Sequence, residues 1–169
     1  MQETVGRRQQ TRAPKTDAFA RGRTVEVWVR RTADRRADEL PCVAQLRRLE
    51  RAGAVDDVVV REWDQTVPVE RPRGVRETFL RERIADFREW AWLTGAELPA
   101  FEHVETVGVG RMGPERTEQF LPPFAVAVYD DGILTAVLPH ERGGHTTTVT
   151  DWLDRPEEAV RPTEPLVVC

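Results

Sequence analysis

Three glycines form the feature of the sequence that comes nearest to a cofactor motif. Gly108, Gly110 and Gly113 reproduce the G-x-G-x-x-G pattern directly after a predicted strand. In dinucleotide-binding proteins this pattern opens a helix, and the N-terminus of that helix receives a pyrophosphate. Pro114 and a polar stretch follow here, so no helix is predicted at that place. We expect a flexible glycine loop and no nucleotide or other cofactor.

Two of the three histidines stand close together in a polar segment. His140 and His145 flank Glu141, and Asp151 follows a few residues later. Zinc sites in proteins use three or four ligands, and these acids are of a type usually found exposed. We therefore expect a mobile polar loop and no metal site. His103 lies on a predicted strand and is interpreted as a structural residue.

Covalent and acid-base catalysis have little support in the sequence. The chain contains no serine, and neither Cys42 nor Cys169 stands in a recognisable catalytic signature. The adjacent carboxylates Asp56-Asp57 and Asp130-Asp131 fall where a strand entry or a turn is predicted. Such acids are normally solvated, whereas general acid-base catalysis needs a perturbed pKa. We predict that the protein has no catalytic residues and is not an enzyme.

Three arginines mark the outer side of the first predicted helix. If that helix reads DNA, then Arg47, Arg48 and Arg51 are the natural contacts to duplex DNA. Glu50 and the acids at positions 56 and 57 oppose this interpretation, because carboxylates repel the phosphate backbone. A solvated helix face is the alternative.

Five tryptophans are spread over the predicted strands and helices. Trp28, Trp63, Trp90 and Trp152 suit a shared core, since large aromatic side chains dominate core packing. Trp92 falls outside the apolar stripe of its helix. It is the candidate contact for a ligand or a partner.

Composition and charge predict a single soluble domain in the cytoplasm. The chain has 169 residues, 40% of them hydrophobic, and its longest apolar run, 124–129, is far shorter than a membrane span. Residues 1–24 carry six basic and two acidic side chains, so this segment has a charge of +4 and the rest of the chain −8. Lys15 is the only lysine. No signal segment is recognised, and two cysteines do not suggest a disulfide framework.

Hydrophobic periodicity predicts the elements of a domain at 24–154. It lies between a disordered basic arm at 1–23 and a disordered proline-rich acidic tail at 155–169. Strands are expected at 24–30, 55–63 and 103–109, and a hairpin at 124–129 and 133–138 with Asp130, Asp131 and Gly132 in its turn. Helices are expected at 38–52, capped by Asp38, at 75–94, and from Thr148 or Thr150 over Trp152.

The order of these elements predicts an α+β fold. A mostly antiparallel sheet with both main helices on one face would form a two-layer sandwich of the ferredoxin-like kind. The joint at 49–60 is also compatible with the last helix and wing of a winged helix-turn-helix domain. The sequence leaves both topologies open.

Several short segments resemble a family of small haloarchaeal proteins over about residues 24–154. These are 25–30, with the sequence VEVWVR; 45–53, QLRRLERAG; 58–63; 87–90, FREW; 129–132, YDDG; and 138–139, LP. Members of that family are generally described as uncharacterised or as helix-turn-helix domain proteins. The resemblance implies a salt-adapted source, in keeping with the scarcity of lysine, and it implies no established activity.

Two hypotheses follow from different classes of function. The first is a transcriptional regulator that binds duplex DNA through the first helix, assisted by the basic arm. A homodimer is one arrangement open to such a regulator. The second is a non-catalytic ligand- or partner-binding sensor module with a ferredoxin-like sheet.

Overall fold

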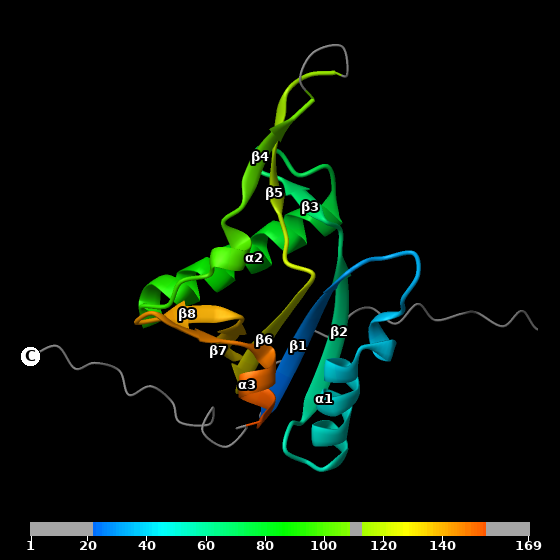
Figure 1. The fold of residues 1–169 in the computed structure, drawn as a ribbon, viewed down its shortest axis with the longest axis vertical. Coiled ribbons are helices and arrows are strands. Elements are labelled where there is room, and N and C mark those ends of the chain that lie inside the picture. Colours follow the sequence, from blue (N-terminus) through cyan, green and yellow to red (C-terminus); the bar gives the residue numbers. More distant parts are fainter. Residues whose placement is uncertain (1–21, 109–112, 155–169) are drawn as a thin grey trace, which may run out of the picture.

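A four-stranded sheet with the strand order β2-β1-β6-β7 forms the centre of the protein (Figure 1). The computed structural model describes residues 22–108 and 113–154. The strands are β1 (Arg23–Arg30), β2 (Asp57–Trp63), β6 (Phe124–Asp130) and β7 (Ile133–Leu138). β1 runs parallel to β2 and antiparallel to β6, and β6 runs antiparallel to β7. The expected α+β class and the mostly antiparallel sheet are confirmed.

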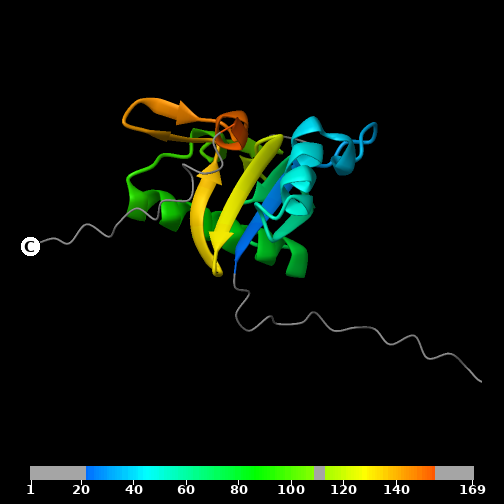
Figure 2. The same ribbon diagram turned by 90° about the horizontal axis from the view of Figure 1, so that it is seen from below.

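Helices cover both faces of this sheet. α1 (Pro41–Arg51) and α3 (Val149–Asp154) pack on one face, and α2 (Val75–Thr94) packs on the other. Figure 2 shows the sheet between these two layers. The expectation that both main helices share one face, as in a two-layer ferredoxin-like sandwich, is therefore wrong.

The side chains of β1 explain why two helical layers form. Val25, Val27 and Val29 point to the side of α1 and α3, whereas Trp28 points to the side of α2. Successive side chains of a strand alternate between the faces of a sheet, and here both faces of a central strand carry apolar groups. Burying both sets requires a covering layer on each side.

α1 begins later than the sequence pattern indicates. Asp38 lies in a separate 3-10 turn, η1 (Ala37–Glu39), and does not cap the helix. Leu40 is extended, with φ −73° and ψ 132°, and Pro41 opens α1. A residue before proline is disfavoured in the helical region, while proline itself suits a first helical position, so the helix starts at Pro41.

The strand after α1 rules out the winged-helix alternative for this part of the chain. β2 pairs with β1 in parallel over its whole length, from Asp57 opposite Thr24 to Trp63 opposite Arg30. A wing is a hairpin beside a recognition helix, whereas β2 is a strand of the main sheet. The segment is a β1-α1-β2 unit.

α2 has the bounds that its periodicity predicts. Leu80, Ile84, Phe87 and Ala91 are buried against the sheet, as helical spacing requires. Gly95 ends the helix with φ +66°, a left-handed conformation that glycine adopts without steric cost. None of the described helices is long and apolar enough to cross a membrane.

A second sheet with the order β3-β5-β4 extends away from the first (Figure 1). It consists of β3 (Thr66–Pro68), β4 (Val104–Val107) and β5 (Arg116–Phe120), and β4 lies within the strand expected at 103–109. β3 and β5 were not predicted. β3 is short and ends in proline, and β5 is mostly polar, so neither carries a strong strand pattern.

The predicted β6–β7 hairpin and the predicted last helix, α3, are both present. In the β6–β7 turn Asp131 and Gly132 both have positive φ angles, 50° and 82°, as a tight hairpin demands. Thr148 caps α3: its Oγ1 accepts the Asp151 N–H at 3.1 Å, and Asp151 Oδ2 accepts the Thr148 N–H at 2.8 Å. β8 (His140–Arg142) pairs antiparallel with β9 (His145–Thr147), so the polar loop expected around His140 and His145 is instead a β-hairpin, and that expectation is wrong. The remaining short element is η2 (Pro99–Phe101).

Candidate nucleic-acid interface

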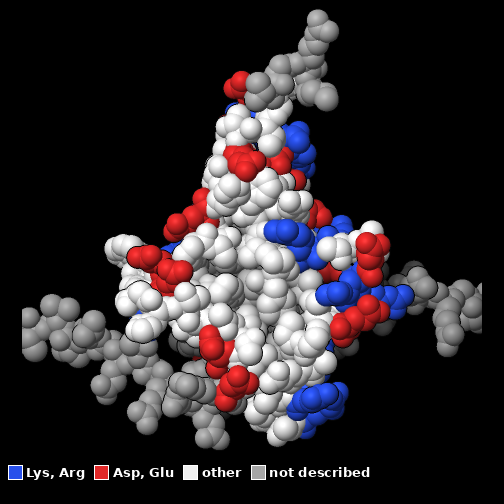
Figure 3. Space-filling model, viewed as in Figure 1, with Lys and Arg blue, Asp and Glu red and all other residues white. Residues whose placement is uncertain are grey.

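α1 presents a basic outer side because its apolar residues face the sheet. Val43 and Leu46 are fully buried, and Arg48 and Arg51 are exposed on the opposite side. Neither arginine forms a salt bridge with any residue in the described part of the chain. Figure 3 shows basic side chains gathered over the lower end of α1. These two guanidinium groups are available to a phosphate backbone.

Arg47 has a different environment from its two neighbours. Its Nη1 donates to the backbone oxygen of Val58 at 2.7 Å and pairs with Glu50 Oε2 at 3.0 Å. Glu50 Oε1 in turn accepts the Val58 N–H at 2.9 Å. This bond from Val58, together with the hydrogen bond from Arg47, holds the pKa of Glu50 below its ordinary value. Arg47 and Glu50 thus fasten α1 to the outer edge of β2.

Three of the sequence-adjacent aspartates form hydrogen bonds with the beginning of β1 and the residue before it. Asp56 Oδ2 accepts the Arg23 N–H at 2.6 Å, and Asp130 Oδ1 pairs with Arg23 Nε at 2.7 Å. Asp131 Oδ1 accepts the Gly22 N–H at 2.8 Å. The hydrogen bond from Arg23 is the main reason that the pKa of Asp130 is lowered. These acids stand at strand ends and in a turn, where the sequence places them.

Trp92 lies on the outer side of α2, 81% exposed, and its neighbour Leu93 is 67% exposed. A shallow pocket of about 280 Å³ beside Trp92 is also lined by Arg88, Leu98 and Phe101. The exposure of Trp92 agrees with its position off the apolar stripe. Its role as a ligand or partner contact stays a prediction.

The histidines make local contacts. His140 Nδ1 lies 2.7 Å from the backbone oxygen of Val137, and the ring packs edge-on against Trp90. His145 is exposed on β9, and His103 Nε2 lies 2.7 Å from Glu105 Oε1. Within residues 22–108 and 113–154, no group of three or more His, Cys, Asp or Glu side chains is placed to hold a metal ion.

The glycine motif joins two antiparallel strands. Gly108 directly follows β4, and Gly113 lies shortly before β5, while positions 109–112 lie outside the described residues. A pyrophosphate site of the dinucleotide-binding type needs a helix after the glycines. The element that follows here is a strand.

Sequence reasoning missed a buried charge cluster between β1 and α2. Glu26 is 5% exposed, and its Oε1 lies 3.3 Å from Arg61 Nε and 3.6 Å from Arg83 Nη2. Arg83 Nη1 donates to the Tyr129 hydroxyl at 3.3 Å, and Phe79 lies between the two guanidinium groups, 5.3 Å from each. Burial, with the nearby Glu26 carboxylate, raises the pKa of Tyr129. The signal in the sequence was Glu26 sharing a strand face with Trp28.

No two described α-helices follow each other directly along the chain, as the helices of a helix-turn-helix motif do. Two strands, β2 and β3, separate α1 from α2, and the element directly before α1 is the 3-10 turn η1. α1 directly follows the helical turn η1, and its exposed side is basic. Among the described helices, α1 is therefore the candidate for contacting DNA.

Comparison with known proteins gives one finding. A family model described as a helix-turn-helix domain matches residues 17–161. No significant match was found among curated proteins or among solved structures. Because the family model matches most of the chain, the protein belongs to this helix-turn-helix domain family.

Proposed function

We propose that the protein is a DNA-associated transcriptional regulator whose α1 contacts the phosphate backbone of duplex DNA. The observation that carries this proposal is the pair Arg48 and Arg51, exposed and not within salt-bridge distance of any carboxylate among the described residues. It is joined by membership of a helix-turn-helix family. The basic residues of the first 23 positions would add contacts of the same electrostatic kind.

The packing of α1 against the sheet suits a rigid contact with DNA. Val43 and Leu46 anchor the helix to the sheet, and Arg47 bonds it to β2. Its outer side carries the small residue Ala44 one turn before Arg48, which leaves room for a close approach. A helix fits the major groove of B-form DNA, so the outer side of α1 is the surface we propose to face the duplex.

The test is a binding titration of a labelled mixed-sequence duplex over a series of salt concentrations. We expect the affinity to fall steeply with salt, because phosphate contacts release counterions. In the double variant R48Q/R51Q the slope should decrease by about 0.9 for each phosphate group that the variant no longer neutralises. The single variants R48Q and R51Q are compared with R142Q, which likewise removes one exposed arginine, from β8. The proposal fails if the wild type binds no duplex at low salt, or if R48Q/R51Q binds as the wild type does.

Arg47 needs a separate expectation, because its guanidinium bonds to β2. R47Q should lower the free energy of unfolding by about 1–2 kcal/mol, since the carbonyl of Val58 loses a charged donor. R48Q and R51Q should change it by less than about 0.5 kcal/mol. Urea denaturation distinguishes these outcomes, and equal losses for all three would contradict the assignment of Arg47 as a structural residue.

A second candidate function is a non-catalytic sensor module that binds a ligand or a partner. The observation in its favour is that α1 packs flat on the sheet through Val43 and Leu46 and does not project from the domain. A thermal-shift screen with metabolites, nucleotides and metal ions tests it, and stabilisation by one class would support it.

We further propose that the regulator acts as a homodimer, which light scattering of the purified protein can check.

A further inference from the structure

β2 forms an open edge of the main sheet. The Arg31 N–H donates to the backbone oxygen of Trp63 at 2.8 Å, so the backbone groups of Trp63 point toward β1. Because the backbone of a strand alternates, the amides and carbonyls of Val58, Val60 and Glu62 point away from β1. They face the outer side of the sheet.

Two of these three outward positions are already occupied. Glu50 and Arg47 bond both backbone groups of Val58, and Arg76 Nη2 donates to the Glu62 carbonyl at 3.1 Å. Val60, between them, has no such side-chain or backbone partner among the described residues. The open stretch of the edge is therefore short and centred on Val60.

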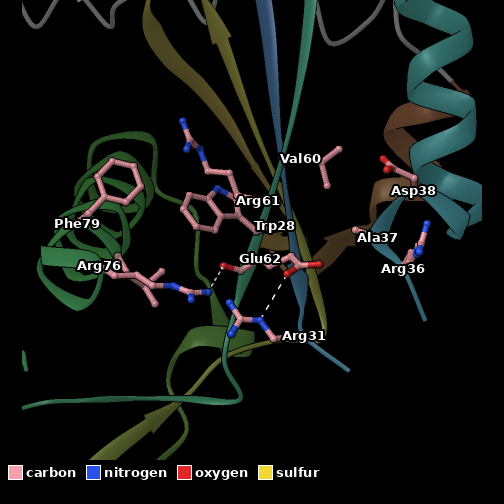
Figure 4. A pocket seen from close by; sticks show the side chains of 11 residues that line it. Trp28, Arg31, Arg36, Ala37, Asp38, Val60, Arg61, Glu62, Arg76 and Phe79 are labelled. Atoms are coloured by element: carbon pink, nitrogen blue, oxygen red, sulfur yellow. Dashed lines mark hydrogen bonds and ion pairs between the residues drawn. The ribbon is translucent and has the colours of Figure 1, made fainter. Parts of the chain in front are cut away.

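This stretch lies in a groove of about 660 Å³. Figure 4 shows β2 between two walls, with Phe79 and Arg76 of α2 on one side and Ala37 and Arg36 on the other. Phe79 is 36% exposed and offers an apolar surface beside the open backbone. The groove thus combines a strand edge with apolar and basic walls, as in sites that bind a peptide by adding a strand.

The charge of the groove is positive. Its lining contains four arginines and two carboxylates: Arg31, Arg36, Arg61, Arg76, Asp38 and Glu62. Arg31 pairs with Glu62 at 3.5 Å, and Arg61 pairs with Glu26. Arg36 and Arg76 have no salt bridge to any described residue. These two cations remain for a partner.

We propose that this groove binds an acidic, extended segment of a partner protein as an additional strand beside β2. A nucleic-acid backbone would supply acceptors only, whereas Val60 offers both an N–H and a C=O, which a peptide can pair. A second copy of the chain would bring the same arginines against each other, and like charges on an edge oppose such pairing. An acidic peptide satisfies both the backbone and the charges.

The probe is a synthetic peptide as long as β2, seven residues, in which valine alternates with glutamate. Binding to the full chain is measured by titration, together with hydrogen exchange of the Val60 amide. We expect saturable binding and slower exchange at Val60. R36E/R76E should weaken binding at least about tenfold, because both unpaired cations are reversed. The R48E/R51E variant changes the same number of charges on α1 and should bind the peptide as the wild type does.

Two further peptides separate the alternatives. One carries lysine in place of glutamate, and the other is methylated at its backbone nitrogens, so it cannot donate to the Val60 carbonyl. Neither should bind. The proposal is overturned if the glutamate peptide does not bind, if the lysine or methylated peptide binds equally well, or if R36E/R76E has no effect. It is also overturned if R36E/R76E abolishes duplex binding and no peptide binds, since the groove would then belong to a DNA surface.

Discussion

At the scale of single residues, Glu26 is a buried carboxylate on the central sheet. Its two arginine partners are partly exposed at the surface. Glu26 is 5% exposed, and the side chains of Arg61 and Arg83 are 37% and 27% exposed. A fully buried ion pair loses about 3–5 kcal/mol when one partner is removed. Here both arginine side chains are partly exposed, so the loss should be smaller.

We therefore expect E26Q to lower the free energy of unfolding by about 1–3 kcal/mol. The control is E62Q, because the Glu62 side chain is 45% exposed and pairs only at the surface with Arg31. That change should stay within about 0.5 kcal/mol. Urea denaturation at neutral pH measures both, and equal effects of the two substitutions would show that the Glu26 cluster adds nothing.

His140 gives the stability a dependence on pH. Burial lowers the pKa of His140, and the positive charge of Arg142 acts in the same direction. An unfolded histidine titrates near about 6.5, so below that pH the unfolded chain binds more protons than the folded one. Stability from this group is complete above that pH. It is lost as the pH falls from there through the lowered pKa of the folded state.

The corresponding prediction compares two histidines of neighbouring strands. H140Q should remove much of the loss of stability between about pH 6.5 and pH 5. The control is H145Q, which replaces an exposed histidine of β9 and should change the free energy of unfolding at neutral pH by less than about 0.5 kcal/mol. Thermal unfolding at a series of pH values checks this, and a slope that H140Q leaves intact would contradict it.

Residue roles were harder to predict than residue positions. The sequence placed Arg47, Arg48 and Arg51 on one helix face, and all three lie on α1. It did not show that Arg47 bonds to Val58, because that contact depends on which strand lies beside the helix. The cluster around Glu26 was missed for the same reason, since its partners come from three different elements.

At the scale of elements, local patterns predicted what local forces determine. α2 was predicted with its observed bounds, and the β6–β7 turn followed from Asp131 and Gly132. β5 pairs with both β3 and β4, and β3 is held only by β5. Such pairing joins distant segments and leaves little periodicity, so it could not be predicted from a local window.

Packing of α1 against the sheet makes a prediction about this element. Leu46 is fully buried, whereas Leu93 on α2 is 67% exposed. L46A should lower the free energy of unfolding by about 2–5 kcal/mol, because it removes buried apolar surface and leaves a cavity. L93A should change it by less than about 0.5 kcal/mol. Comparable losses for the two substitutions would mean that α1 is not anchored through Leu46.

At the scale of the whole molecule, one sheet separates two apolar clusters. Trp28, Trp63 and Trp90 lie in the cluster under α2, and Trp152 lies in the cluster under α1 and α3. The composition predicted enough apolar residues for a core, but not its division. The division follows from the two central strands, β1 and β6, each of which buries apolar side chains on both faces of the sheet. Periodicity along a single strand does not predict this arrangement of strands.

Because β1 contributes to both clusters, the two should unfold together. Protein labelled with 5-fluorotryptophan allows Trp63 and Trp152 to be followed separately by fluorine NMR during urea denaturation, one for each cluster. We expect coincident midpoints, as for a two-state domain. V27A truncates a fully buried side chain of β1 and should lower the free energy of unfolding by about 2 kcal/mol. Both midpoints should then move together to a lower urea concentration. Loss of the Trp152 signal at a lower urea concentration than that of Trp63 would instead show that the α1 and α3 layer unfolds independently of the sheet.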